Sequence, residues 1–176
     1  MIRPLPSVRS ALALFLTLFL LWILLAQVNH SLAPWHVYLF AGGLYVTQAA
    51  LVMALRPGFA AILAAGMVCD ANTPVPFGTH TLMFAVTYAV LYRLRDRLPH
   101  EELVGQIAIV LIANFALFFG LTFLRLRPVP RFAWPRLVSD LLLSQLFIGL
   151  VAPWYFSLQQ RALALAADRS AESYRA

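Results

Sequence analysis

The stretch Ser10–Val28, SALALFLTLFLLWILLAQV, decides the class of fold that this sequence can adopt. It holds no charged residue, and after Ser10 at its start Thr17 is its one polar group before Gln27. Since a helix needs about 20 apolar residues to cross a bilayer, the stretch predicts a transmembrane helix. It is too long for the apolar region of a signal peptide and lacks a small-x-small cleavage site, so we expect the helix to be retained.

The whole chain has the composition of a membrane protein. Of its 176 residues, 62% are hydrophobic and 11% are charged, and the mean hydropathy is +0.81. A soluble domain has roughly 25% charged residues, so a water-soluble fold is excluded. About six spans would use up this length, so we expect one transmembrane domain over residues 1–160 and a cytoplasmic tail over residues 161–176.

Five further apolar runs follow the first, and each is expected to cross the membrane or to form part of it. They cover residues 35–55, 58–70, 77–92, 103–124 and 137–158. The second run contains small and hydrogen-bonding residues that let helices approach closely, namely Gly42, Gly43, Thr47 and Gln48. We therefore expect it to be buried more than the first run, and we expect Arg56-Pro57 to end it.

The third run is shorter than the others. Its 13 residues make roughly 20 Å of helix against about 30 Å of hydrocarbon. It is therefore either a short span or a re-entrant element shielded by its neighbours. The predicted fold class is an all-α membrane protein of about six transmembrane helices, with a short third helix.

The positions of the arginines predict the orientation of the chain. Every one of the 13 basic residues is arginine, and the arginines lie between apolar runs rather than on one polar face, which excludes a nucleic-acid partner. If all six runs cross the membrane, nine arginines lie on the side of the N-terminus and four on the other side. The positive-inside rule then places both termini in the cytoplasm of a multi-pass inner-membrane protein.

The four arginines that break this rule lie in the loop before the last run. Arg131 is one of them, and Trp134 stands beside the loop as a candidate aromatic anchor. The loop is either a local exception to a statistical rule or a periplasmic contact surface for a partner.

Asp70 and Asp140 are the carboxylates closest to membrane depth, where an ionised group is costly and marks a candidate site. Asp70 ends the third run, at the C-terminal pole of its helix, so it needs a compensating partner such as Asn72, Thr79, His80 or an arginine of the loop. Three readings stay open for Asp70: a cap of the turn in interfacial water, an internal bridge that holds the short helix, or a proton or ligand role.

Asp140 and Asn114 have structural interpretations. Asp140 lies early in the last run, where Arg136 is an i,i+4 partner, so a local stabilising pair is expected. Asn114 lies in the middle of the fifth run among Ala113, Ala116 and Gly120, which predicts an interhelical hydrogen bond through a seam of small residues.

Residues that could carry out catalysis are not arranged in any recognisable pattern. The sequence contains no HExxH motif, no glycine-rich phosphate loop and no set of serine, histidine and aspartate on convergent segments. We therefore expect no enzyme activity, no cofactor and no metal site.

The region from Arg56 to about Leu158 resembles MreD, the family of rod shape-determining membrane proteins. The resemblance rests on the stretch from Gly58 through Gly66 to Asp70, on Gly78 after a short polar turn, and on an aromatic span that ends in an arginine cluster. Trp134, Pro153 and Trp154 resemble the closing pattern of the same family.

This resemblance implies a non-enzymatic scaffold of the bacterial cell-elongation complex. Such a protein binds the bitopic protein MreC and helps to couple MreB filaments to peptidoglycan synthases and rod shape. It also implies a fold similar to the substrate-binding subunits of energy-coupling-factor vitamin transporters, which supply the alternative function. The first run lacks the Ala-x-x-x-Ala face that such a subunit would use for docking.

On the scaffold reading, ten residues are candidates for partner binding or for packing. They are Gly58, Gly66, Asp70, Gly78, Asn114, Arg131, Trp134, Asp140, Pro153 and Trp154.

Overall fold

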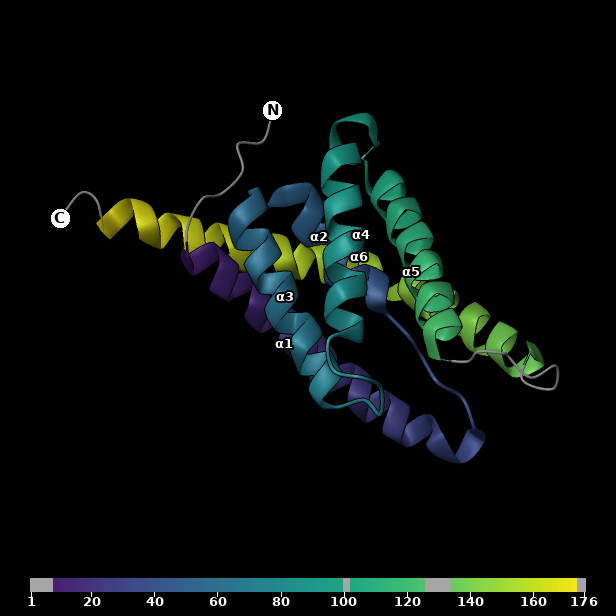
Figure 1. Ribbon diagram of the computed structural model, residues 1–176. Coiled ribbons are helices and arrows are strands. Elements are labelled where there is room, and N and C mark those ends of the chain that lie inside the picture. The colour runs from purple at the N-terminus through teal and green to yellow at the C-terminus, as the bar shows by residue number, and fades with distance from the viewer. Residues whose placement is uncertain (1–7, 100–101, 126–133, 174–176) are drawn as a thin grey trace.

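The structure, a computed structural model, describes residues 8–99, 102–125 and 134–173, and in these residues all regular secondary structure is helical (Figure 1). The elements are α1 (Val8–Leu32), η1 (Ala33–Trp35), α2 (Gly42–Val52), α3 (Leu55–Ala71), α4 (Thr79–Leu94), η2 (Arg95–Arg97), α5 (Leu103–Arg125) and α6 (Trp134–Ser173). The predicted all-α class is confirmed.

Three of these helices are long and apolar enough to cross a membrane. The qualifying segments are Ser10–Trp35, Leu103–Leu124 and Trp134–Leu165. Length and composition therefore give the chain the character of a helical membrane protein. The helices α3 and α4 are shorter, with 17 and 16 residues.

The second apolar run does not form the single helix that we expected over residues 35–55. Only Gly42–Val52 is α-helical, and residues 37–41 run from the end of η1 to α2 without helix (Figure 1). The prediction was wrong because side chains of α1 and α6 bind the backbone of this segment, as described below. All residues from Gly42 to Leu51 are buried, so the greater burial expected for this run is confirmed.

The break between α2 and α3 also lies earlier than expected. Met53 and Ala54 are extended, and α3 begins at Leu55, so Arg56-Pro57 does not end α2. Pro57 lies in the first turn of α3, where backbone N–H groups have no acceptor within the helix and a proline costs little. With 17 residues, α3 is about 25 Å long, which is longer than the predicted third helix.

The last two helices differ in how closely they follow the expected ends. α5 ends within one residue of the expected position, whereas α6 passes through Pro153 and continues to Ser173, well beyond residue 158. The residues after 158 are rich in alanine and leucine, which are strong helix formers, so the helix continues into the expected tail.

The helices form a bundle around α2. α2 contacts α3, α4, α5 and α6, while α1 packs against α3 and α6. The connections alternate between two ends of the bundle (Figure 1). We call the end where α1, α3 and α5 finish the Asp70 end, and the end where α2 and α4 finish the Arg95 end.

Candidate functional site

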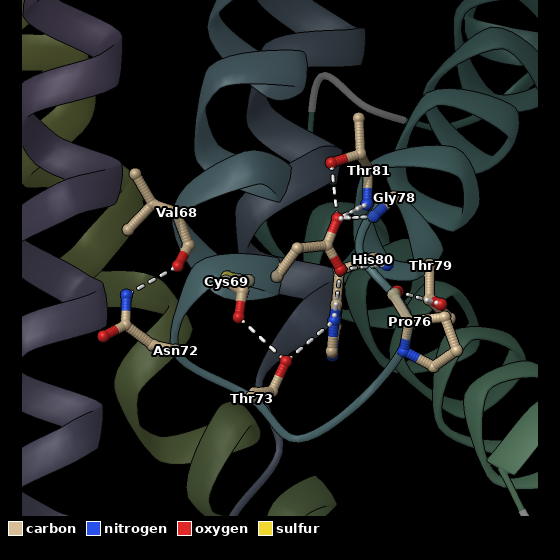
Figure 2. A network of polar contacts seen from close by, with 10 residues as sticks. Val68, Cys69, Asn72, Thr73, Pro76, Gly78, Thr79, His80 and Thr81 are labelled. Atoms are coloured by element: carbon tan, nitrogen blue, oxygen red, sulfur yellow. Dashed lines mark hydrogen bonds and ion pairs between the residues drawn. The ribbon is translucent and has the colours of Figure 1, made fainter.

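The carboxylate of Asp70 joins the end of α3 to the beginning of α4. Its partners Gly78, His80 and Thr81 are labelled in Figure 2. Its Oδ1 accepts hydrogen bonds from the backbone N–H of His80 at 2.7 Å and from Nδ1 of the same residue at 2.9 Å. Its Oδ2 accepts from the N–H of Gly78 at 3.0 Å, and from the N–H and hydroxyl of Thr81 at 3.0 and 2.6 Å. Asp70 is only 4% exposed, so these contacts replace water.

This arrangement explains how a carboxylate is held at the C-terminal pole of a helix. The N–H groups of Gly78, just before α4, and of His80 and Thr81, in its first turn, have no intrahelical acceptor. A helix N-terminus favours an anion, and this offsets the unfavourable pole of α3. Asp70 thus caps α4 from outside it, and we call this set of contacts the Asp70 lock.

Of the partners that we expected for Asp70, His80 is confirmed. Asn72 instead donates to the carbonyl of Val68 at 2.8 Å, and Thr79 donates to that of Pro76 at 2.6 Å. Three interpretations of Asp70 were open, and its hydrogen bonds to Gly78, His80 and Thr81 are those of an internal bridge that holds α3. Thr81 was missed, although its position three residues after Gly78 is where a capping group finds an N–H donor.

The glycines of the same region allow α3 and α4 to meet closely. A Cβ atom on Gly66 would lie 2.6 Å from Cα of Thr81, so the two backbones touch beside Asp70. A Cβ on Gly58 would meet the side chain of Tyr88 on α4. Gly78, just before α4, has a φ of +97°, which L side chains rarely adopt. Gly58, Gly66, Asp70 and Gly78 therefore all act in one helical hairpin.

A second polar cluster holds the non-helical segment before α2. The Asn29 side chain forms two hydrogen bonds with the backbone of Leu39, at 2.8 and 2.9 Å. Asp140 accepts the N–H of Tyr38 at 3.1 Å, and the hydroxyl of Ser144 accepts the N–H of Phe40 at 2.9 Å. Non-helical backbone inside a membrane protein needs such partners.

This cluster changes the interpretation of Asp140. Among the ion pairs between described residues, none joins Asp140 to Arg136, so the expected i,i+4 pair is not formed there. Asp140 is 7% exposed and binds a backbone group 102 residues away in the sequence. Asp140 therefore joins α6 to the segment 37–41 and does not stabilise its own helix through an ion pair with Arg136.

Asn114 joins α5 to α2, as the sequence predicts. It is fully buried, and its Oδ1 accepts the N–H of Gly43 at 3.1 Å. A Cβ on Gly43 would lie 2.8 Å from the backbone nitrogen of Asn114, so only glycine permits this approach. The interhelical hydrogen bond through small residues is confirmed.

The break between α2 and α3 is closed by side chains of α4 and η2 at the Arg95 end. Nη1 of Arg95 donates to the carbonyl of Met53 at 3.3 Å, and the Tyr88 hydroxyl donates to that of Leu55 at 3.2 Å. The Arg95 guanidinium also lies 4.2 Å from the centroid of the Tyr92 ring. The sequence marked Arg95 only as a topology signal, because its acceptor on Met53 lies 42 residues away.

The remaining candidate residues do not join the Asp70 lock. Arg131 lies outside the described residues. Trp134 is the first residue of α6, is half exposed and lines an apolar groove between α5 and α6. Pro153 lies inside α6, and the adjacent Trp154 is 81% exposed.

The Asp70 lock holds two helices together. Five donors surround a carboxylate that has about four lone-pair sites, so its hydrogen-bonding capacity is used within the α3–α4 hairpin. In the described ranges, no three histidine, cysteine, aspartate or glutamate side chains lie close enough to hold a metal ion. Comparisons of the chain with protein-family models, with curated proteins and with solved structures find no match.

Proposed function

We propose that this protein is a non-enzymatic membrane scaffold of the bacterial cell-elongation complex, similar to MreD. The observation that supports the proposal most is the α3–α4 hairpin. Gly58, Gly66, Asp70 and Gly78, on which the resemblance rests, have one common task there, since they hold the two helices in direct contact. A sequence pattern that forms a single packed unit is a stronger basis for a resemblance than scattered matches.

The proposal includes six crossings of the inner membrane with both termini in the cytoplasm. α3 and α4 are about 25 and 24 Å long, enough to cross a slightly thinned bilayer. α2 provides only about 16 Å of helix, but the non-helical residues 37–41 extend the same crossing inside the protein. The alternation of connections between the two ends, together with the nine-to-four split of arginines, supports this topology.

The partner in this proposal is MreC, and through it the MreB filament and the peptidoglycan synthases. The apolar groove between α5 and α6 is a candidate contact surface at the Asp70 end, which the topology places on the periplasmic side of the membrane. It is lined by Phe119, Trp134 and Val138, all of which are partly exposed. Exposed aromatic residues of this kind are enriched at the centres of protein interfaces.

Co-purification tests this function. Tagged MreC from the source organism, expressed with this chain and extracted in mild detergent, is expected to retain it. Trp134→Ala should weaken that retention, whereas Trp35→Ala, at an exposed tryptophan outside the groove, should leave it unchanged.

Two results would count against the proposed function. If wild-type protein fails to co-purify with MreC, the scaffold assignment is wrong. If the protein instead retains a vitamin tightly through purification, the alternative of an energy-coupling-factor substrate-binding subunit gains the support that the scaffold loses.

A further inference from the structure

Four arginines lie at the Arg95 end of the bundle, where α4 finishes and α3 begins. Arg93 and Arg97 are exposed in the sequence on either side of Arg95. Arg56 is exposed in the first turn of α3. The hydrogen bond from Arg95 to the carbonyl of Met53 holds η2 against the residues just before α3, so it brings the two groups of arginines to the same end.

Few carboxylates neutralise these arginines. The carboxylates described at this end are those of Asp96 and Glu102, so the four arginines outnumber them by two. Asp96 lies 3.7 Å from Arg95, and among the ion pairs between described residues none involves the other three arginines. The positive charge of this end is therefore available to an anion from outside the chain.

The guanidinium of Arg95 is already held in position. It donates to the carbonyl of Met53 at 3.3 Å and lies 4.2 Å from the centroid of the Tyr92 ring, which stacks on Tyr88. A guanidinium has five N–H donors in a planar fork that matches phosphate oxygens, and the contact with Met53 uses one of them. The Arg95 side chain is 22% exposed, so the other donors can meet a phosphate with little further ordering.

An exposed apolar face of α4 leads to these arginines. Leu82, Val86 and Val90 are exposed and recur every four residues, so they lie on one side of the helix. Arg93 follows Val90 by three residues on the same side. The face from Leu82 to Arg93 is about 16 Å long, close to the roughly 15 Å of hydrocarbon in one leaflet of a bilayer. It therefore has the length of an acyl chain whose headgroup lies beside the arginines.

We propose that the Arg95 end binds the phosphate headgroup of an anionic phospholipid, with one acyl chain along Leu82, Val86 and Val90. Each arginine near the membrane surface adds about 1 kcal/mol to the attraction of anionic lipid, or about fivefold in affinity. The apolar face beside the arginines favours a lipid over a water-soluble phosphate. The proposal requires that the chain lies in a membrane, and it does not depend on MreC as a partner.

Native mass spectrometry of the purified protein, titrated with single lipids in detergent, measures this binding. Dioleoylphosphatidylglycerol is expected to bind at least fivefold more tightly than dioleoylphosphatidylcholine, which has the same chains but no net charge. Glycerol 3-phosphate carries the phosphate without the chains, so it should not displace the anionic lipid at equal concentration.

Two matched variants locate the site. Arg93→Gln removes one charge at an exposed position of the Arg95 end and should weaken binding of the anionic lipid about fivefold, without changing that of the zwitterionic lipid. Arg136→Gln removes the same charge at an exposed position on α6 at the Asp70 end and should leave both unchanged. Equal binding of the two lipids, equal losses in the two variants, or displacement by glycerol 3-phosphate would each overturn the proposal.

Discussion

At the scale of single residues, Asp70 shows how much the sequence could predict about a buried charge. Its position at the end of an apolar run required a partner, and His80 was among the expected ones. The sequence could not predict that both oxygens would be shared among the N–H groups of Gly78, His80 and Thr81. That detail depends on the path of the turn, which brings the first turn of α4 back onto the end of α3.

Asp70→Ala should destabilise the protein strongly, because it leaves buried and partly buried donors at the beginning of α4 without an acceptor. The expected loss is about 3 to 5 kcal/mol in the free energy of unfolding. Unfolding by SDS titration in detergent micelles measures it. Asp96→Ala is the control, since the Asp96 side chain is 87% exposed and lies 3.7 Å from Arg95, and this change should cost less than about 1 kcal/mol. Equal losses for the two variants would show that the Asp70 lock contributes nothing.

At the scale of elements, the close packing of the α3–α4 hairpin could be predicted from the sequence, whereas the non-helical segment 37–41 could not. The small-residue pattern of the third run predicted close helix packing, and the contact of Gly66 with Thr81 agrees with it. The non-helical segment left no local signal, because its partners Asp140 and Ser144 lie 102 and 104 residues away. Apolar composition alone predicted a helix there, and tertiary hydrogen bonds override that preference.

Gly66→Ala should push α3 and α4 apart, because its Cβ would meet the backbone of Thr81 at 2.6 Å. The expected cost is about 1 to 3 kcal/mol in stability. The matched change Gly149→Ala, on α6, meets nothing within 4 Å and should be neutral or stabilise by up to about 1 kcal/mol. Thermal unfolding of both variants checks this, and a destabilisation of the Gly149 variant as large as that of the Gly66 variant would contradict it.

Ser144→Ala should loosen the segment before α2. It leaves the partly buried N–H of Phe40 without an acceptor, which costs about 1 kcal/mol. Ser139→Ala, one turn earlier on α6, removes a hydroxyl that is exposed and bonded only to Arg136, so a change within about 0.5 kcal/mol is expected. Hydrogen exchange of the Phe40 amide gives the more local readout, and unchanged protection in the Ser144 variant would refute the assignment.

At the scale of the whole molecule, the central helix α2, buried from Gly42 to Leu51, is surrounded by longer helices with exposed apolar residues. The composition predicted the membrane class and the number of apolar runs. It did not predict that α2 would be only 11 residues long or that α6 would extend to Ser173. Helix ends depend on capping contacts from distant residues, such as those of Arg95 and Tyr88 at the break after α2.

Accessibility labelling tests the six-crossing topology most directly. In a Cys69→Ala background, which removes the only cysteine, single cysteines at Phe77, Asp96 and Ser173 are reacted with a membrane-impermeant maleimide in intact cells. The cysteine at position 77 should react from outside, and those at positions 96 and 173 only after the membrane is permeabilised. Reaction of position 96 or 173 in intact cells, or protection of position 77, would contradict a six-crossing bundle with both termini in the cytoplasm.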